Sequence, residues 1–157
     1  MLGKSLQKYL SKYYSVFPAS KLDNDSIIPN LKLDITNSEE VDNILQTISP
    51  DYIVNCAAYT NVDNSERDKK LSYDVNVSGL RNLISHSSLN TKIIQISTDY
   101  VFDGSKELYS EQDIPNPISY YGKVKLEAEN VLRSARRDSI VLRTSVIYDE
   151  SPNSFFS

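Results

Sequence analysis

The sequence lacks the features that mark secreted, membrane and metal-binding proteins. Its 157 residues include one cysteine, so Cys56 has no partner within the chain for a disulfide. There is no run of about 18 apolar residues and no signal peptide pattern at the start of the chain. These absences predict a cytoplasmic protein that neither enters a membrane nor depends on disulfides.

Histidine and basic charge are scarce as well. His86 is the only histidine and has no cysteine near it in the sequence, so the spacing of a metal site is missing and no metal is predicted. The formal net charge of −4 argues against a nucleic acid partner. With 39% hydrophobic and 24% charged residues, the composition is that of a globular protein, and residues 1–157 are expected to form one domain.

Apolar runs and helical stripes alternate along the chain. Candidate strands are residues 15–17, 31–33, 52–56, 92–97 and 140–142. Helices are predicted to begin near residue 1, after a Thr36-x-x-Glu39 capping box, at 68 with an end near 89, and at 119; residues 60–67 are predicted as a polar turn. This alternation predicts an α/β fold, a Rossmann-like doubly wound parallel sheet with helices on both faces.

The stretch 97–125 carries the most chemistry. The strand at 92–97 brings the Thr98 hydroxyl to the carboxyl edge of the sheet, where α/β proteins bind ligands. Tyr121 and Lys125 are four residues apart on a helix, which makes their side chains neighbours. A nearby ammonium favours the phenolate, so Lys125 is expected to lower the pKa of Tyr121, and Thr98 to face the same carbonyl oxygen.

The spacing Tyr-x-x-x-Lys is weak evidence by itself, because 11 tyrosines make chance occurrences common. Three other positions also have two interpretations. Gly3 is either the last glycine of a dinucleotide-binding turn or an ordinary helix residue. Small side chains after the strand at 52–56 either admit a flat ligand or serve tight packing alone. Asn76, within the predicted helix at 68–89, is either exposed or held by hydrogen bonds, and we favour the second.

Four blocks of the sequence resemble the dTDP-4-dehydrorhamnose reductase family of the extended short-chain dehydrogenase/reductase superfamily. They are NCAAYTNVD at 55–63, STDYVFDG at 97–104, PNP at 115–117 with YGKVKL at 121–126, and RTS at 143–145. The resemblance covers residues 3–156 and has the blocks in the family's order. It implies reduction, with NADPH or NADH, of the 4-keto group of a dTDP-linked 6-deoxysugar in dTDP-L-rhamnose biosynthesis.

The resemblance also implies roles for single residues. Tyr121 matches the catalytic acid, Lys125 the residue that lowers its pKa and holds the nicotinamide ribose, and Thr98 the hydroxyl partner. Cofactor contacts are implied at Gly3, Asp34, Ile35, Ala57, Ala58, Tyr59, Tyr121 and Lys125, and substrate contacts at Thr60, Val62, Asp63, Asp99 and Thr144. Ser20 and Lys21, rather than an acidic residue, follow the strand at 15–17, which favours NADPH.

The chain departs from the family in three places. The strand and two glycines that precede Gly3 in the family are missing, and so is the C-terminal region that closes over the substrate, so a reductase truncated at both ends is expected. Val146 replaces a common tryptophan, which leaves the sugar open. The alternatives are a nucleotide-sugar epimerase or dehydratase, or a non-catalytic subunit like the regulatory subunit of methionine adenosyltransferase. A homodimer and the activity of these residues alone are also left open.

Overall fold

The computed structural model describes residues 2–21, 31–136 and 138–147. Contacts within the chain form two compact units, residues 1–34 with 146–157 and residues 35–145. That the two units make up one domain stays a prediction. None of the helices in the described ranges has the length and apolar character needed to cross a bilayer.

The first unit contains helix α1 (Leu2–Leu10) and two short parallel strands, β1 (Ala19–Ser20) and β2 (Leu31–Lys32). The helix predicted from residue 1 is confirmed, and Gly3 lies exposed in its first turn. The strand predicted at 15–17 is wrong, because pairing starts only after Pro18. Proline has no N–H to donate to a strand pair, but its carbonyl accepts a hydrogen bond from the Leu31 N–H at 2.8 Å.

The second unit contains a parallel sheet in the order β3 (Tyr52–Asn55), β4 (Lys92–Thr98) and β5 (Ile140–Thr144). Asn55 pairs with Gln95, and Thr98 pairs with Thr144. The side chains of Asn55 and Gln95 are also joined by a buried hydrogen bond of 2.8 Å. The three strands predicted for this region are confirmed, and their carboxyl ends meet at one edge of the sheet.

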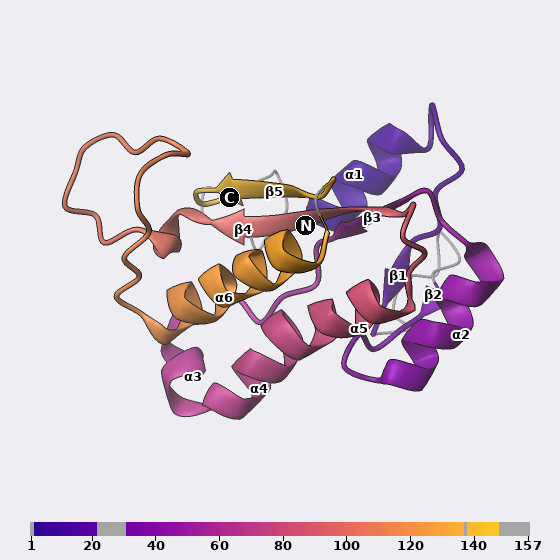
Figure 1. The fold of residues 1–157 in the computed structure, drawn as a ribbon, viewed down its shortest axis with the longest axis horizontal. Coiled ribbons are helices and arrows are strands. Elements are labelled where there is room, and N and C mark those ends of the chain that lie inside the picture. Colours follow the sequence, from indigo (N-terminus) through magenta and orange to yellow (C-terminus); the bar gives the residue numbers. More distant parts are fainter. Residues whose placement is uncertain (1, 22–30, 137, 148–157) are drawn as a thin grey trace. The chain divides into compact units, whose positions relative to one another are not determined.

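Five α-helices belong to this unit: α2 (Ser38–Ile48), α3 (Val62–Arg67), α4 (Lys69–Tyr73), α5 (Gly79–His86) and α6 (Tyr120–Ala135). The π-helix Asp74–Ser78 joins α4 to α5, and a 3₁₀ turn, Asp99–Val101, follows β4. Figure 1 shows α4, α5 and α6 on one side of the sheet. The π-helix, α5, α6 and β4 contribute the buried core of this unit, which contains Val77, Leu80, Ile93, Val124, Ala128 and Leu132.

The other face of this sheet is more open. Ile140 and Leu142 are 47% and 46% exposed there, whereas Ile93 on the helix-covered face is 0% exposed. The expectation of helices on both faces is therefore met on one face within the second unit.

Two helix starts differ from the sequence prediction. The N-cap of α2 is Asn37 rather than Thr36, because the Asn37 Oδ1 accepts hydrogen bonds from the N–H of Glu39 at 3.1 Å and from the next N–H at 3.3 Å. The region predicted as a polar turn contains α3, since Asn61 caps it by accepting from the Asn64 N–H at 2.9 Å. An asparagine side chain therefore begins each helix.

The long helix predicted from 68 to 89 is present as α4, the π-helix and α5, which follow one another without a loop. Gly79 lets it pack closely, because a Cβ at this position would lie 2.6 Å from the Ile35 Cδ1. At its end, His86 bridges to α2, with Nε2 at 2.8 Å from the Ser38 Oγ and Nδ1 at 3.1 Å from the Asp42 Oδ1. The single histidine thus joins two helices.

Candidate active site

Thr98, Tyr121 and Lys125 lie together near the carboxyl edge of the sheet in the second unit. Thr98 ends β4, and its Oγ1 accepts a hydrogen bond from the Tyr100 N–H at 3.2 Å. Ser119 caps α6 and so fixes the helix that places Tyr121 and Lys125 on its buried side. Thr98, Tyr121 and Lys125 are 6%, 8% and 3% exposed, so their polar groups act in a largely water-free environment.

The hydroxyls of Thr98 and Tyr121 converge. The Thr98 hydroxyl lies close enough to the phenol to act on the pKa of Tyr121. The Tyr100 ring packs edge-on against the Tyr121 ring, with centroids 5.8 Å apart, and the Thr98 Oγ1 also donates to the Asp99 Oδ1 at 3.2 Å. The predicted meeting of a strand-end hydroxyl with a phenol from the next helix is therefore present in the fold.

The electrostatics of Tyr121 differ from the prediction. Burial raises the pKa of the phenol, and the neighbouring Thr98 hydroxyl opposes this shift. Lys125 donates through Nζ to the Ile96 carbonyl at 2.6 Å, and burial lowers its pKa to about 8. The expected lowering by Lys125 is absent, because Lys125 is not among the groups that shift the pKa of Tyr121 and desolvation of the phenolate dominates.

Two asparagines fix the loop after β3. The Asn55 Oδ1 accepts from the Ala57 N–H at 3.2 Å. Asn76, from the π-helix, accepts from the Tyr59 N–H at 3.2 Å and donates to the Tyr59 carbonyl at 3.1 Å. Asn76 is 2% exposed, which confirms the preference for a hydrogen-bonded asparagine. The backbone of the loop is held in place, while the small side chain of Ala57 is exposed and Ala58 is half-buried.

A buried carboxylate connects α6 with two strands. Glu129 lies one helical turn after Lys125, and its side chain is 0% exposed. Its Oε1 accepts from the Ser97 Oγ at 2.6 Å and the Arg143 Nε at 3.0 Å. Its Oε2 accepts from the Arg143 Nη2 at 2.7 Å and the Arg133 Nη2 at 3.0 Å. One side chain thus joins α6 to the ends of β4 and β5.

Two of the predicted substrate residues lie beside the Thr98 and Tyr121 side chains. Asp99 follows Thr98 in the chain, and its charge contributes to the raised pKa of Tyr121. Thr144 pairs with Thr98 across the sheet, and its Oγ1 donates to the Ser97 carbonyl at 3.4 Å. Both therefore lie at the sheet edge where Tyr121 approaches.

The other predicted substrate residues belong to the start of α3. Val62 and Asp63 are in its first turn, and Thr60 is exposed just before it. Glu66, further along α3, accepts a hydrogen bond from the Tyr120 N–H at 2.6 Å. This contact ties α3 to the first turn of the helix that carries the catalytic candidates.

Two of the predicted cofactor residues belong to the first unit, and a third is buried within the second. Gly3 and Asp34 belong to the first unit, where Asp34 forms an ion pair of 2.6 Å with Lys21. Ile35 belongs to the second unit, but its side chain is buried beneath Gly79.

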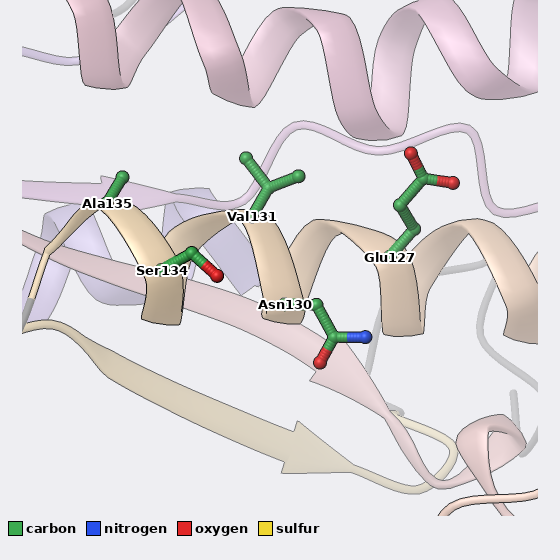
Figure 2. A pocket seen from close by; sticks show the side chains of 5 residues that line it. All are labelled: Glu127, Asn130, Val131, Ser134 and Ala135. Carbon is green, nitrogen blue, oxygen red and sulfur yellow. The ribbon is translucent and has the colours of Figure 1, made fainter.

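A hollow of about 420 Å³ lies over α6 and does not include this group. Figure 2 shows the side chains that line it, Glu127, Asn130, Val131, Ser134 and Ala135, all from that one helix. None of them belongs to the predicted site. Within the described residues, no group of three or more His, Cys, Asp or Glu side chains is placed to hold a metal ion.

A family model described as the RmlD substrate binding domain matches residues 1–157. The chain belongs to this family. It is 44% identical over 129 residues to the dTDP-4-dehydrorhamnose reductase of Aggregatibacter actinomycetemcomitans, which covers 79% of the chain and 43% of the reductase. It is 37% identical over 120 residues to methionine adenosyltransferase 2 subunit beta of Bos taurus, covering 76% of the chain and 36% of that subunit.

The RmlD family assignment agrees with a crystal structure. The dTDP-4-dehydrorhamnose reductase of Bacillus anthracis str. Ames, in complex with NADP, has a TM-score of 0.86 and 38% identity, and the match covers 98% of this chain and 53% of that chain. The predicted Rossmann-like α/β fold is confirmed. The chain spans about half the length of this structure and less than half of the curated relatives.

Sequence reasoning missed two residues of this RmlD family chain. Glu129 follows Tyr121 and Lys125 at the same four-residue interval, so a charged residue on a buried stripe was the available signal. Gly122 lies within one of the four blocks, but nothing local indicates that a Cβ there would come within 2.2 Å of the Tyr100 carbonyl oxygen. Its contact depends on how the loop after β4 folds.

Proposed function

We propose that the protein is an NADPH-dependent reductase of a dTDP-linked 4-keto-6-deoxysugar, a dTDP-4-dehydrorhamnose reductase that forms dTDP-L-rhamnose. The observation that carries the proposal is the buried contact between Thr98 and Tyr121, with Lys125 one turn further along α6. Identity of 44% with a reductase of that name supports the substrate. The proposal concerns the full-length protein, because the chain covers 43% of that relative.

The protonation of Tyr121 suits the reductive direction. Burial raises the pKa of the phenol, so Tyr121 is neutral at pH 7 and can donate its proton to a carbonyl oxygen that gains negative charge. The Thr98 hydroxyl lies beside the phenol and can stabilise the same oxygen once its proton turns away from the Asp99 carboxylate. Bound NADPH would supply the hydride to the carbonyl carbon. Tyr121 and Thr98 therefore hold the oxygen while its carbon is reduced.

The residues present fit a nicotinamide cofactor. Among the described residues, the Lys125 ammonium has one hydrogen-bond partner, the Ile96 carbonyl, so two of its three N–H donors can reach ribose hydroxyls. Ala57, Ala58 and Tyr59 form a fixed loop at the same sheet edge, and Ala57 leaves room for a flat ring.

The remaining cofactor and substrate contacts rest on the family. We assign Gly3 to the last glycine of the dinucleotide-binding turn and Asp34 with Ile35 to the adenine; the exposed Lys21 side chain favours NADPH over NADH. The dTDP-sugar is assigned to Thr60, Val62, Asp63, Asp99 and Thr144. A cytoplasmic location and a homodimer are part of the proposal, and neither a nucleic acid nor a membrane is a proposed partner.

Substitution of Tyr121 by phenylalanine tests the proposal. In the full-length protein, Tyr121→Phe removes the proton donor and should lower dTDP-4-dehydrorhamnose-dependent NADPH oxidation by about 100-fold or more, with NADPH binding retained. Tyr52→Phe, at the exposed start of β3, is the control and should stay within about twofold of wild type. Equal rates in both variants would contradict the mechanism. An epimerase or dehydratase would regenerate its cofactor and show no net NADPH oxidation.

A non-catalytic subunit is the second candidate, supported by 37% identity to methionine adenosyltransferase 2 subunit beta. On that reading, purified full-length protein does not oxidise NADPH with the dTDP-sugar but binds a methionine adenosyltransferase catalytic subunit. Tyr121→Phe and Lys125→Met would then leave that binding unchanged. A pull-down with the catalytic subunit, beside the NADPH assay, separates the two functions.

A further inference from the structure

Glu129 completes a row of three functional groups along α6. Tyr121, Lys125 and Glu129 follow one another at intervals of four residues and are 8%, 3% and 0% exposed. A carboxylate fully withdrawn from water is tolerated only when hydrogen bonds and opposite charges satisfy it. Glu129 accepts four hydrogen bonds, one from Ser97, two from Arg143 and one from Arg133.

Two of the three partner residues of Glu129 lie one residue before the site hydroxyls. Ser97 precedes Thr98 on β4, and Arg143 precedes Thr144 on β5. Ser97 and Arg143 are also paired across the sheet. The carboxylate therefore holds two neighbouring strands against α6 at the last position before their hydroxyls reach the sheet edge.

Arg143 extends this contact to the loop that leaves β4. Its guanidinium binds Glu129 through both Nε and Nη2, and it lies over the Phe102 ring with 5.0 Å between the Cζ and the ring centroid. The two-pronged bond fixes the plane of the guanidinium. The strand ends, the helix and the start of the loop thus share one buried anchor.

The charge of Glu129 also acts on the pKa of Lys125. Burial lowers the pKa of Lys125 to about 8, and the charge of Glu129 acts in the opposite direction. Cys56, at the end of β3, is the other titratable group that acts on Lys125. The Glu129 carboxylate therefore favours the ammonium form that a ribose hydroxyl would meet.

We propose that Glu129 is a positioning residue of this site, which aligns the ends of β4 and β5 with α6 one helical turn beyond Lys125. The inference rests on the proposed reductase function for its catalytic consequence. Its structural part concerns Lys125 and the strand ends and can be measured without turnover.

Glu129→Gln in the full-length protein tests the charge. The variant keeps the shape and some acceptor capacity but removes the negative charge, so the titration of Lys125, followed by its 13Cε NMR chemical shift, should move down by about one pH unit. The alkaline fall of kcat/KM should move with it, and kcat/KM at pH 8 should drop about fivefold. Arg133→Gln, which removes the half-exposed partner of the same carboxylate, is the control and should not move the titration downward.

Ser97→Ala tests the alignment of β4 with α6 and leaves the Glu129 charge in place. It is the alternative variant if Glu129→Gln does not fold. Loss of the 2.6 Å bond should lower kcat about three- to tenfold, with the KM for NADPH within twofold and the Lys125 titration unchanged. An unmoved Lys125 titration in Glu129→Gln, or wild-type kcat in Ser97→Ala, overturns the role of Glu129 even if the wild type is active. If the Lys125 titration shifts in Glu129→Gln but the wild-type protein does not oxidise NADPH, the role of Glu129 is supported and the reductase proposal is overturned.

Discussion

Gly122 packs directly against the backbone of Tyr100. A Cβ at position 122 would lie 2.2 Å from the Tyr100 carbonyl oxygen and 3.0 Å from the Pro117 Cβ. Because the nearest obstacle is backbone rather than the end of a flexible side chain, only glycine permits this approach. The contact sets the spacing between the helix of Tyr121 and the strand end of Thr98.

Gly122→Ala should therefore force α6 away from the turn after β4. We expect the free energy of unfolding to fall by about 1–3 kcal/mol, the usual cost of overpacking, despite the better helix propensity of alanine. Urea denaturation followed by circular dichroism measures the change. Lys123→Ala, at the next and exposed position, should stay within about 0.5 kcal/mol of wild type. A Gly122→Ala protein as stable as that control would show that the helix can shift freely.

Asn76 holds the loop proposed to run along the cofactor. Asn76→Ala leaves the N–H and carbonyl of Tyr59 without their partner, so we expect a loss of about 1–3 kcal/mol in stability and about tenfold weaker NADPH binding. Thr91→Val is the control, because the buried Thr91 hydroxyl donates at 2.8 Å to the Pro50 carbonyl, before β3 and β4 begin. Calorimetric titration with NADPH should show near wild-type affinity for Thr91→Val. Equal losses of affinity in both variants would contradict a specific role for the loop.

The fold could be predicted where local pattern decides it. The buried strands of the second unit and the helix that begins after Ser119 follow from apolar periodicity and capping. The meeting of Thr98 with Tyr121 follows too, because parallel strands end at one edge and the next helix returns to it. Local pattern fails for the first strand, which is predicted at 15–17 but lies after Pro18. The apolar run at 15–17 has no partner strand among the described residues, and pairing cannot be seen in the sequence.

The electrostatics of the site depend on depth, which sequence does not show. The spacing of Tyr121 and Lys125 predicts that they are neighbours, but the direction of each pKa shift follows from how little water reaches them. Glu129 illustrates the same limit. Its place on the stripe is visible in the sequence, whereas Ser97 and Arg143 become its partners only through the sheet register.

The loop after β4 is organised around Asp103. Its carboxylate accepts hydrogen bonds from the Tyr109 hydroxyl at 2.6 Å, the Ser105 N–H at 2.9 Å and the Asn116 Nδ2 at 2.9 Å. The Tyr109 bond, followed by the others, holds the pKa of Asp103 well below the usual range of a carboxyl group. The stabilising contribution is present above the ordinary aspartate pKa and is lost only as pH falls below that range.

Asp103→Asn should therefore loosen this loop at neutral pH. An amide cannot accept all three bonds at charge-assisted strength, so we expect cleavage after Lys106 by trypsin to become about three- to tenfold faster, with little change in global unfolding. Glu111→Gln, an exposed change on the same loop, should leave the cleavage rate within about twofold. Because the pKa of Asp103 is lowered, the wild-type loop should stay protected from trypsin down to the lowest pH at which the protease works. Faster cleavage in both variants would indicate that net charge, rather than the Asp103 bonds, protects the loop.

The buried ammonium of Lys125 should cost the fold stability at neutral pH. Its pKa of about 8 lies below the 10.5 of an exposed lysine, so between these values the unfolded chain binds a proton that the folded chain does not. The free energy of unfolding of the wild type should therefore rise with pH across this window, relative to a variant without the ammonium. Below pH 8 the full cost of burying the charge, about 3 kcal/mol, applies.

Lys125→Met removes that charge and keeps a long apolar side chain. At pH 7 we expect the variant to be about 2 kcal/mol more stable than wild type, since the lost hydrogen bond to the Ile96 carbonyl offsets part of the gain. Urea titrations at pH 7 and pH 10 should show the difference shrink as pH rises. Lys123→Met, on the exposed side of the same helix, should change stability at pH 7 by about 0.5 kcal/mol or less. A Lys125→Met protein less stable than wild type at pH 7 would contradict this, because it would show that Lys125 stabilises the fold.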